Sequence, residues 1–175
     1  HHVISGYGRH EVIIDHACHG ILLGEMAVEH ISDIFSLYRD RMTALYNTND
    51  NHTYILVFKN FGPASGGSIA HTHSQVIAMP VIPANVEMEL ANSLNYYRRH
   101  QECIFCALID DSRHYEATVY DKVSGKQSRQ IETGQYIIEK GDSFVAIKPF
   151  ASRFPWEVHI LPRIHSHDFQ GITER

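Results

Sequence analysis

The sequence has no long hydrophobic run, no cluster of basic residues and few cysteines, and each absence excludes a class of protein. No apolar stretch among the 175 residues comes near the roughly 18 that a membrane-spanning helix needs. The first ten residues, HHVISGYGRH, lack the apolar segment of a secretory signal. Acidic residues outnumber basic ones by 20 to 15. We therefore predict a cytoplasmic protein whose partners include neither a membrane nor a nucleic acid polymer.

Cysteine and histidine give the first indication of chemistry. Only three cysteines are present, and two of them, Cys103 and Cys106, form a CxxC pair. Without a secretory signal, such a pair favours metal or redox chemistry over a disulfide framework. Histidine is abundant, at 14 residues, which favours metal binding or acid–base chemistry. We interpret the remaining cysteine, Cys18, as a small buried side chain that is not a ligand.

Hydrophobic residues make up 43% of the chain, enough for the core of one medium domain or two small ones. Apolar residues recur at three- and four-residue steps over 24–46, which predicts an amphipathic helix with the stripe Ala27, Ile31, Ile34, Phe35, Tyr38, Met42 and Leu45. A second helix is expected over 85–101. Strands are expected at 11–15, 54–58, 71–79, 143–148 and 157–161, with short strands between 115 and 141. The strand YILVF (54–58) is apolar throughout, which predicts a central position.

An internal repeat relates two distant parts of the chain. HEVIIDHACH (10–19) and WEVHILPRIH (156–165) align without a gap. Each segment has Glu-Val at the start of a strand and ends on a histidine, His19 in the first and His165 in the second. We interpret the two segments as parts of two copies of one αβ unit.

The segment HTHSQ (71–75) carries the clearest chemical pattern. Alternate side chains of a strand share a face, so we expect His71, His73 and Gln75 on one side. The preceding segment NFGPASGGS (60–68) is rich in glycine, which lets backbone N–H groups approach an anion closely. Neutral imidazole is a competent nucleophile toward phosphorus near neutral pH. The pattern favours phosphate chemistry, although a metal-ligand pair, ordinary strand residues or a simple glycine turn are alternatives.

These motifs resemble a known family. VFKNFGPASGGSIAHTHSQVIAMPVIP (57–83) resembles the active-site segment of the galactose-1-phosphate uridylyltransferase branch of the histidine-triad superfamily. GRHEVIIDHACHG (8–20) resembles the family's strand-and-histidine element, and CIFCALI (103–109) with the segment 144–169 resembles the start of its second repeat. Threonine stands where the uridylyltransferases proper have proline between the two histidines, so the likeness leans toward the ADP-glucose phosphorylase type within the branch.

The resemblance implies a mechanism. His73 is expected to attack the α-phosphorus of a nucleotide sugar, release a sugar 1-phosphate and hold the nucleotide covalently until a sugar phosphate or phosphate accepts it. Gln75 replaces the third histidine of the hydrolase branches; an amide can hydrogen-bond phosphate oxygens but cannot protonate a leaving group as imidazolium does, which favours transfer over hydrolysis. The residues expected to contact phosphate are Asn60, Gly66, Gly67 and Ser68.

The same resemblance implies zinc at one or two sites. Cys103 and Cys106 have the spacing of a zinc knuckle. His165 is implied as their third ligand, with His159, His167 and His114 as alternatives. By the internal repeat, His19 and His71 would be the equivalent half of another site. A reduced cysteine pair near a helix start is the alternative interpretation of the CxxC.

The expected fold is α+β, with an antiparallel, half-barrel-like sheet of the histidine-triad type and helices on one side. Two related repeats are expected, 1–100 lacking its start and carrying HTHSQ, and 101–175 lacking its end and starting with CxxC. Exposed strand edges favour a homodimer. Two alternatives to the transferase are a hydrolase of nucleotide conjugates and a non-catalytic, zinc-stabilised nucleotide-binding module.

Overall fold

A computed structural model describes residues 6–48, 51–67 and 69–172. Its contacts divide the chain into two compact units, His1–Val86 with Asp168–Arg175, and Glu87–His167. The proposed division into repeats at residues 100 and 101 rests on internal similarity, a different criterion from compactness, and stays a prediction. Within the described ranges, no helix is both long enough and apolar enough to cross a membrane.

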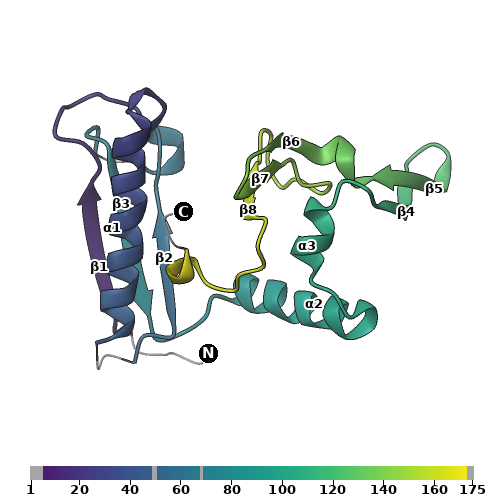
Figure 1. The fold of residues 1–175 in the computed structure, drawn as a ribbon, viewed down its shortest axis with the longest axis horizontal. Coiled ribbons are helices and arrows are strands. Elements are labelled where there is room, and N and C mark those ends of the chain that lie inside the picture. The colour runs from purple at the N-terminus through teal and green to yellow at the C-terminus, as the bar shows by residue number, and fades with distance from the viewer. Residues whose placement is uncertain (1–5, 49–50, 68, 173–175) are drawn as a thin grey trace. The chain divides into compact units, whose positions relative to one another are not determined.

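The first unit is built on a three-stranded antiparallel sheet in the order β1 (Arg9–Ile14), β3 (His73–Met79), β2 (Tyr54–Phe58). Strands β2 and β3 are adjacent and joined through the glycine-rich segment, as predicted (Figure 1). The central position predicted for Tyr54–Phe58 is wrong, because β3 pairs on both sides and β2 pairs with β3 alone among the described strands. The apolar sequence predicted the strand but not its position in the sheet, and only Ile55 of its residues is buried.

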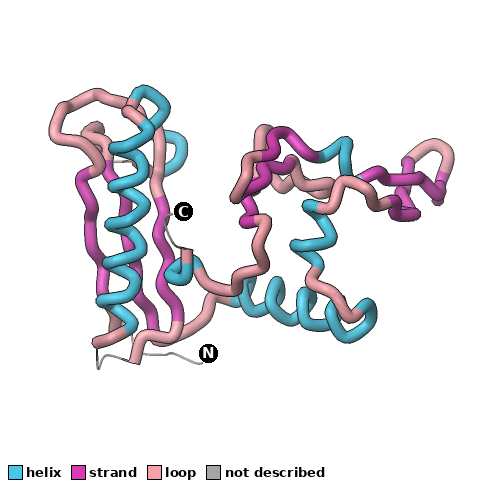
Figure 2. The backbone as a smooth tube through the Cα atoms, in the orientation of Figure 1, coloured by secondary structure: helices cyan, strands magenta, loops and turns pink. Residues whose placement is uncertain are grey.

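Helix α1 (Val28–Tyr46) packs along one face of this sheet (Figures 1 and 2). The predicted stripe supplies much of the core, which consists of Ile13, Met26, Ile34, Tyr38, Met42, Leu45, Ile55, Val76 and Ala78. Full burial of such a side chain stabilises the fold by about 1.5–3 kcal/mol. Phe35 departs from the expectation, since it is 46% exposed at the edge of the stripe.

The helix begins later than the predicted residue 24. Residues Leu23–Glu25 form a separate 3-10 turn, closed by the Glu25 carboxylate, which accepts from the Leu22 N–H at 2.9 Å. Met26 and Ala27 are then extended. A local side chain to backbone hydrogen bond thus competes with the helix at its start.

Strand β3 starts at His73, whereas the sequence pattern predicted His71. Ahead of the strand, the Asp15 N–H donates to the Thr72 carbonyl at 3.2 Å. This bond continues the pairing of β1 with β3 by one residue, so His71 precedes the paired residues, and the prediction that the strand starts at His71 is wrong. The side chains of Ser74, Val76 and Ala78 are buried, while Gln75 and Ile77 belong to the opposite face.

The second unit contains α2 (Ala84–His100, which begins in the first unit), α3 (Ile104–Ile109) and two small antiparallel sheets. One sheet pairs β4 (His114–Asp121) with β5 (Gly125–Glu132), and the other has the order β6 (Ile137–Lys140), β7 (Phe144–Ile147), β8 (His159–Pro162). Among the described residues of the second unit, the buried ones are Ala107, Ile131, Thr133, Val145 and Ile147. Helix α3 places the CxxC, and the segment after β8 carries His165.

Candidate functional site

His73, the predicted nucleophile, is held in one tautomer at the first position of β3. Its Nδ1 lies 2.8 Å from the His71 carbonyl, which can only accept, so Nδ1 carries the proton and donates. The lone pair of the neutral ring is then on Nε2. His73 is only 6% exposed, yet it lines a cavity of about 570 Å³ in the first unit. A neutral imidazole with a fixed lone pair beside a cavity is suited to nucleophilic attack.

The cavity is walled by residues 20–24 and by the glycine-rich segment. Asn60, Gly67 and His71 line it, together with apolar side chains from Ile21, Leu22, Leu23, Phe61 and Ile69. Asn60 and Gly67 therefore lie at the same cavity as His73. Ser68, which the resemblance also implies as a phosphate contact, lies outside the described residues.

The glycine-rich segment is a closed turn whose amide groups are partly used internally. The N–H groups of Ser65 and Gly67 both donate to the Gly62 carbonyl, at 3.2 Å, and the Gly66 N–H donates to the Pro63 carbonyl at 3.1 Å. The expectation of a cradle of N–H groups open to an anion is thus not what this structure shows for Gly66 and Gly67. Gly62 and Gly66 have φ of +78° and +83°, which a residue with a Cβ rarely adopts.

A buried polar network lies behind His73, on the helix side of the sheet. Lys59 donates from Nζ to the Asp15 carboxylate at 2.5 Å, to the Thr72 hydroxyl at 2.7 Å and to the His73 carbonyl at 3.0 Å. Ser74 donates to the same Asp15 oxygen at 3.0 Å, and Tyr38 hydrogen-bonds Ser74. Burial raises the pKa of the Tyr38 phenol. Sequence reasoning missed this network, since its members lie far apart in the chain and share no spacing.

Gln75, the other predicted catalytic residue, is fixed from the neighbouring strand. Its side-chain Oε1 lies 2.9 Å from Nε2 of His10 on β1. Because an amide oxygen can only accept, the imidazole donates. His10 was not singled out by sequence reasoning, although it stands within the repeated segment.

His19 and His71 come together as the internal repeat predicted. Their Nδ1 atoms are 3.2 Å apart, and Nε2 of His71 donates to the His16 carbonyl at 2.7 Å. That second bond places the lone pair of neutral His71 on Nδ1. Two nitrogens bound tetrahedrally to zinc at about 2.05 Å lie about 3.3 Å apart, and a ligand imidazole commonly donates its other N–H to a carbonyl. The pair could therefore supply two ligands to a metal.

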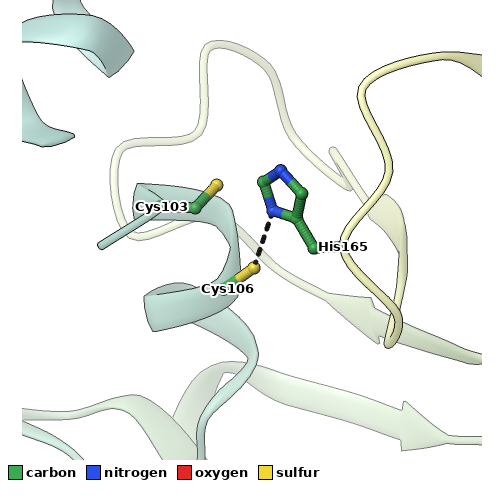
Figure 3. Close-up of side chains that lie close together, drawn as sticks. All are labelled: Cys103, Cys106 and His165. Carbon is green, nitrogen blue, oxygen red and sulfur yellow. Dashed lines mark hydrogen bonds between the residues drawn. The ribbon is translucent and has the colours of Figure 1, made fainter. Parts of the chain in front are cut away.

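The second unit brings Cys103, Cys106 and His165 together (Figure 3). Their candidate ligand atoms all lie within 4.8 Å of one another, and Cys106 Sγ is 3.3 Å from His165 Nδ1. Zinc bonds of about 2.3 Å to sulfur and 2.05 Å to nitrogen give a separation of about 3.6 Å at the tetrahedral angle. Burial, together with neighbouring Cys103, raises the pKa of the Cys106 thiol. This group can hold a metal ion, which would favour the thiolates.

The other candidate ligands lie elsewhere. Among the described residues, the only compact group of three potential ligands is the one just named. His159 hydrogen-bonds Glu157 at 3.1 Å, and His114 starts β4. Cys18 is exposed, which corrects the expectation of a buried side chain. It stands in the turn after β1, where its N–H donates to His16 Nδ1 at 2.9 Å.

The chain is similar in sequence to enzymes of two related kinds. The chain is 29% identical to an ADP-glucose phosphorylase of Arabidopsis thaliana over 98% of the chain and 42% of that protein. It is 28% identical to a galactose-1-phosphate uridylyltransferase of Thermotoga maritima, over 89% of the chain and 42% of that protein. A family model described as the N-terminal domain of a domain of unknown function (DUF4931) matches residues 4–82.

A solved structure gives the same result for the fold. The crystal structure of an Arabidopsis thaliana ADP-glucose phosphorylase with bound ADP-glucose matches with a TM-score of 0.80 and 28% identity, over 98% of this chain and 48% of that one. The α+β fold predicted from the sequence is thereby confirmed as that of uridylyltransferase-like proteins. These matches make the chain similar to ADP-glucose phosphorylases and galactose-1-phosphate uridylyltransferases and support a place in that branch, and a place in the histidine-triad superfamily is consistent with this. The chain spans less than half of the length of the relatives it matches.

Proposed function

We propose that the protein is a nucleotidyltransferase that moves a nucleoside monophosphate between a nucleotide sugar and a sugar phosphate or phosphate, through a covalent adduct on His73. The observation that carries the proposal is the hydrogen bond from His73 Nδ1 to the His71 carbonyl at 2.8 Å. It leaves the lone pair on Nε2 of a neutral ring at the 570 Å³ cavity. Similarity to enzymes that act by nucleotidyl transfer supports the same conclusion.

The proposed reaction is a double displacement at the α-phosphorus. The His73 Nε2 lone pair forms a bond to the α-phosphorus, and the bond from that phosphorus to the bridging oxygen breaks, so the sugar 1-phosphate leaves with the electron pair. In the second half, an oxygen of phosphate or of a sugar phosphate attacks the same phosphorus and His73 leaves as the neutral ring. The proton stays on Nδ1 and remains hydrogen-bonded to the His71 carbonyl, and this bond stabilises the positive charge that the ring gains in the adduct. Gln75 and Asn60 are proposed to donate hydrogen bonds to phosphate oxygens in both halves.

The metal is proposed to be zinc with a structural role. Cys103, Cys106 and His165 would hold it in the second unit, and His19 with His71 would contribute to another site in the first. Binding there would fix the carbonyl of His71 that orients His73, because His71 would be held at both nitrogens. The chemistry of these donor sets, thiolates and imidazoles, is that of structural zinc.

Location and assembly belong to the same proposal. The three cysteines are free, which suits the reducing cytoplasm. The face of the sheet opposite α1 exposes Val12, Ile14 and Leu56, at 51%, 58% and 38%. An exposed apolar face of this kind supports a homodimer.

We propose that the nucleotide sugar comes from galactose or glucose metabolism.

The decisive experiment is an intact mass of the protein after incubation with UDP-glucose or ADP-glucose, quenched without acid. A gain of one UMP or one AMP, absent in His73→Ala and present in the control His167→Ala, is expected, and it names the base. The adduct should be labile in acid and stable in base. An adduct that persists in His73→Ala would overturn the role of His73. Release of free nucleotide without an acceptor would favour a hydrolase, and zinc with nucleotide binding but no adduct would favour a binding module.

A further inference from the structure

The pairing of β1 with β3 brings His10 to Gln75. Val12 is directly opposite Gln75 in the register, and His10 is opposite Ile77. His10 therefore lies on the diagonal from Gln75 and on the same face of the sheet, within reach of a long side chain. The distance from His10 Nε2 to Gln75 Oε1 is 2.9 Å.

This bond decides which end of the amide is used. The two ends of a glutamine amide have opposite hydrogen-bonding character, since the oxygen accepts and the NH2 group donates. With the oxygen engaged by His10, both N–H donors of Gln75 are left for another acceptor. A phosphate oxygen can only accept, so the reversed amide would present lone pairs to lone pairs.

The neighbouring strand residues directly opposite Gln75 do not fix the orientation of its amide, whereas His10 does. The residues directly across from Gln75 are Val12 on β1 and Phe58 on β2, and neither side chain has a polar atom. Ile14 stands opposite His73 on the same face. None of these three side chains can hydrogen-bond the Gln75 amide, so His10 is the cross-strand partner that can set its orientation.

We propose that His10 is a positioning residue that holds the Gln75 amide with its N–H donors available to the substrate phosphate. The inference deepens the proposed function and rests on it, because Gln75 is assigned to the phosphate there. His10 touches no reacting atom and acts through Gln75. It would explain why an imidazole stands beside the glutamine that occupies the place of the third histidine.

Three substitutions separate orientation from mere contact. His10→Ala removes the partner, His10→Gln keeps a neutral donor, and His10→Glu offers only acceptors and so selects the reversed amide. The measured quantity is the single-turnover rate of adduct formation on His73 at saturating UDP-glucose or ADP-glucose, whichever gives the adduct. Loss of one hydrogen bond of about 1.4 kcal/mol corresponds to roughly tenfold in rate.

We expect His10→Ala to react about 10-fold more slowly, His10→Glu more slowly still, and His10→Gln within about threefold of the unsubstituted protein. The substrate dissociation constant should change less than the rate, since folding and the cavity are untouched. The same three changes are then made in a Gln75→Met background. In that background the adduct should form at nearly the same rate in all three variants. Any remaining slowing by His10→Glu measures the effect of its charge alone.

A second measurement does not depend on catalysis. Long-range proton–nitrogen correlation spectra of the unsubstituted protein should show His10 protonated at Nε2 and unprotonated at Nδ1 when the ring is neutral. The opposite tautomer would overturn the inference. So would His10→Glu reacting faster than His10→Ala, or effects of His10 that persist undiminished in the Gln75→Met background. Absence of any adduct in the unsubstituted protein would instead overturn the proposed function, and the tautomer would still test the contact.

Discussion

Lys59 and Asp15 form an ion pair directly behind the proposed nucleophile, with 2.5 Å between Nζ and Oδ2. The Asp15 side chain is 0% exposed and that of Lys59 is 22% exposed. The three protons of the ammonium have three acceptors, one of which is the His73 carbonyl. The pair thus ties the ends of β1 and β2 to the start of β3, at the residue that carries the chemistry.

Breaking this pair should be costly. In Lys59→Met the buried Asp15 carboxylate loses its cation, and removal of one partner of a buried pair costs about 3–5 kcal/mol. The free energy of unfolding, measured with urea, should fall by that amount, whereas the exposed Lys122→Met should leave it within about 0.5 kcal/mol. The double change Asp15→Leu with Lys59→Met should recover at least half of the loss, because no uncompensated charge is then buried. A Lys59→Met protein as stable as the unsubstituted one would show that water or another group replaces the ammonium.

A second ion pair joins β1 to α1 and should make stability depend on pH. Arg41 donates to both oxygens of Glu11, at 2.7 and 2.8 Å, and these hydrogen bonds lower the pKa of the Glu11 carboxyl. A lowered folded-state pKa means that the stabilisation is present above the unfolded pKa and is lost as pH falls through the folded value.

Glu11→Gln should therefore be less stable than the unsubstituted protein at pH 7, by about 0.5–1 kcal/mol for a partly exposed pair, and the difference should be smaller at pH 3, where more of the Glu11 carboxyl is protonated. Urea unfolding at the two pH values measures this difference. The exposed Glu89→Gln serves as control and should show no difference at either pH. A gap of the same size at pH 3 would mean that Glu11 acts through packing and not through its charge.

Sequence reasoning reached the parts of this protein that have a period or a motif. The stripe over Ile34, Tyr38, Met42 and Leu45 predicted α1 because a buried helical face repeats every 3.6 residues. HTHSQ and CxxC were identified because short spacings carry their chemistry. The meeting of His19 with His71, and of Cys106 with His165, was predicted through the repeat and the family resemblance.

The contacts that could not be predicted from the sequence join residues far apart in the chain and follow no spacing pattern. Lys59 and Asp15 are 44 residues apart, and His10 and Gln75 are 65 residues apart. Only the register of β1 against β3 makes such pairs neighbours, and one sequence does not reveal a register. The start of β3 was misplaced by two residues, since the alternation in HTHSQ does not show where the pairing with β1 begins.

The glycine-rich turn should require glycine at position 66. Gly66 has φ of +83°, a left-handed conformation that costs an L-residue about 1–2 kcal/mol. Gly66→Ala is expected to lower the free energy of unfolding by that amount and to weaken nucleotide binding measured by calorimetry with UMP or AMP. Gly6→Ala is the control, because a Cβ there meets nothing within 4 Å, φ is not positive and Gly6 is not part of the cavity lining. Equal stability and binding of the two variants would show that the turn readily adopts another conformation.

The Cys103, Cys106 and His165 group should bind zinc and couple it to the stability of the second unit. We expect Cys106→Ser to lower zinc affinity at least tenfold, since even a lost outer contact to a metal ligand costs about 10–100-fold. The control Cys18→Ser should retain the zinc content, measured by mass spectrometry of the metal. Removal of the metal with a chelator should lower the melting temperature of the unsubstituted protein but leave that of Cys106→Ser almost unchanged. Binding should also weaken as pH falls, because the thiols must lose their protons and the pKa of Cys106 is raised. Full zinc content in Cys106→Ser, with the same response to the chelator, would place the metal elsewhere, and His71→Ala would then test the His19 and His71 pair.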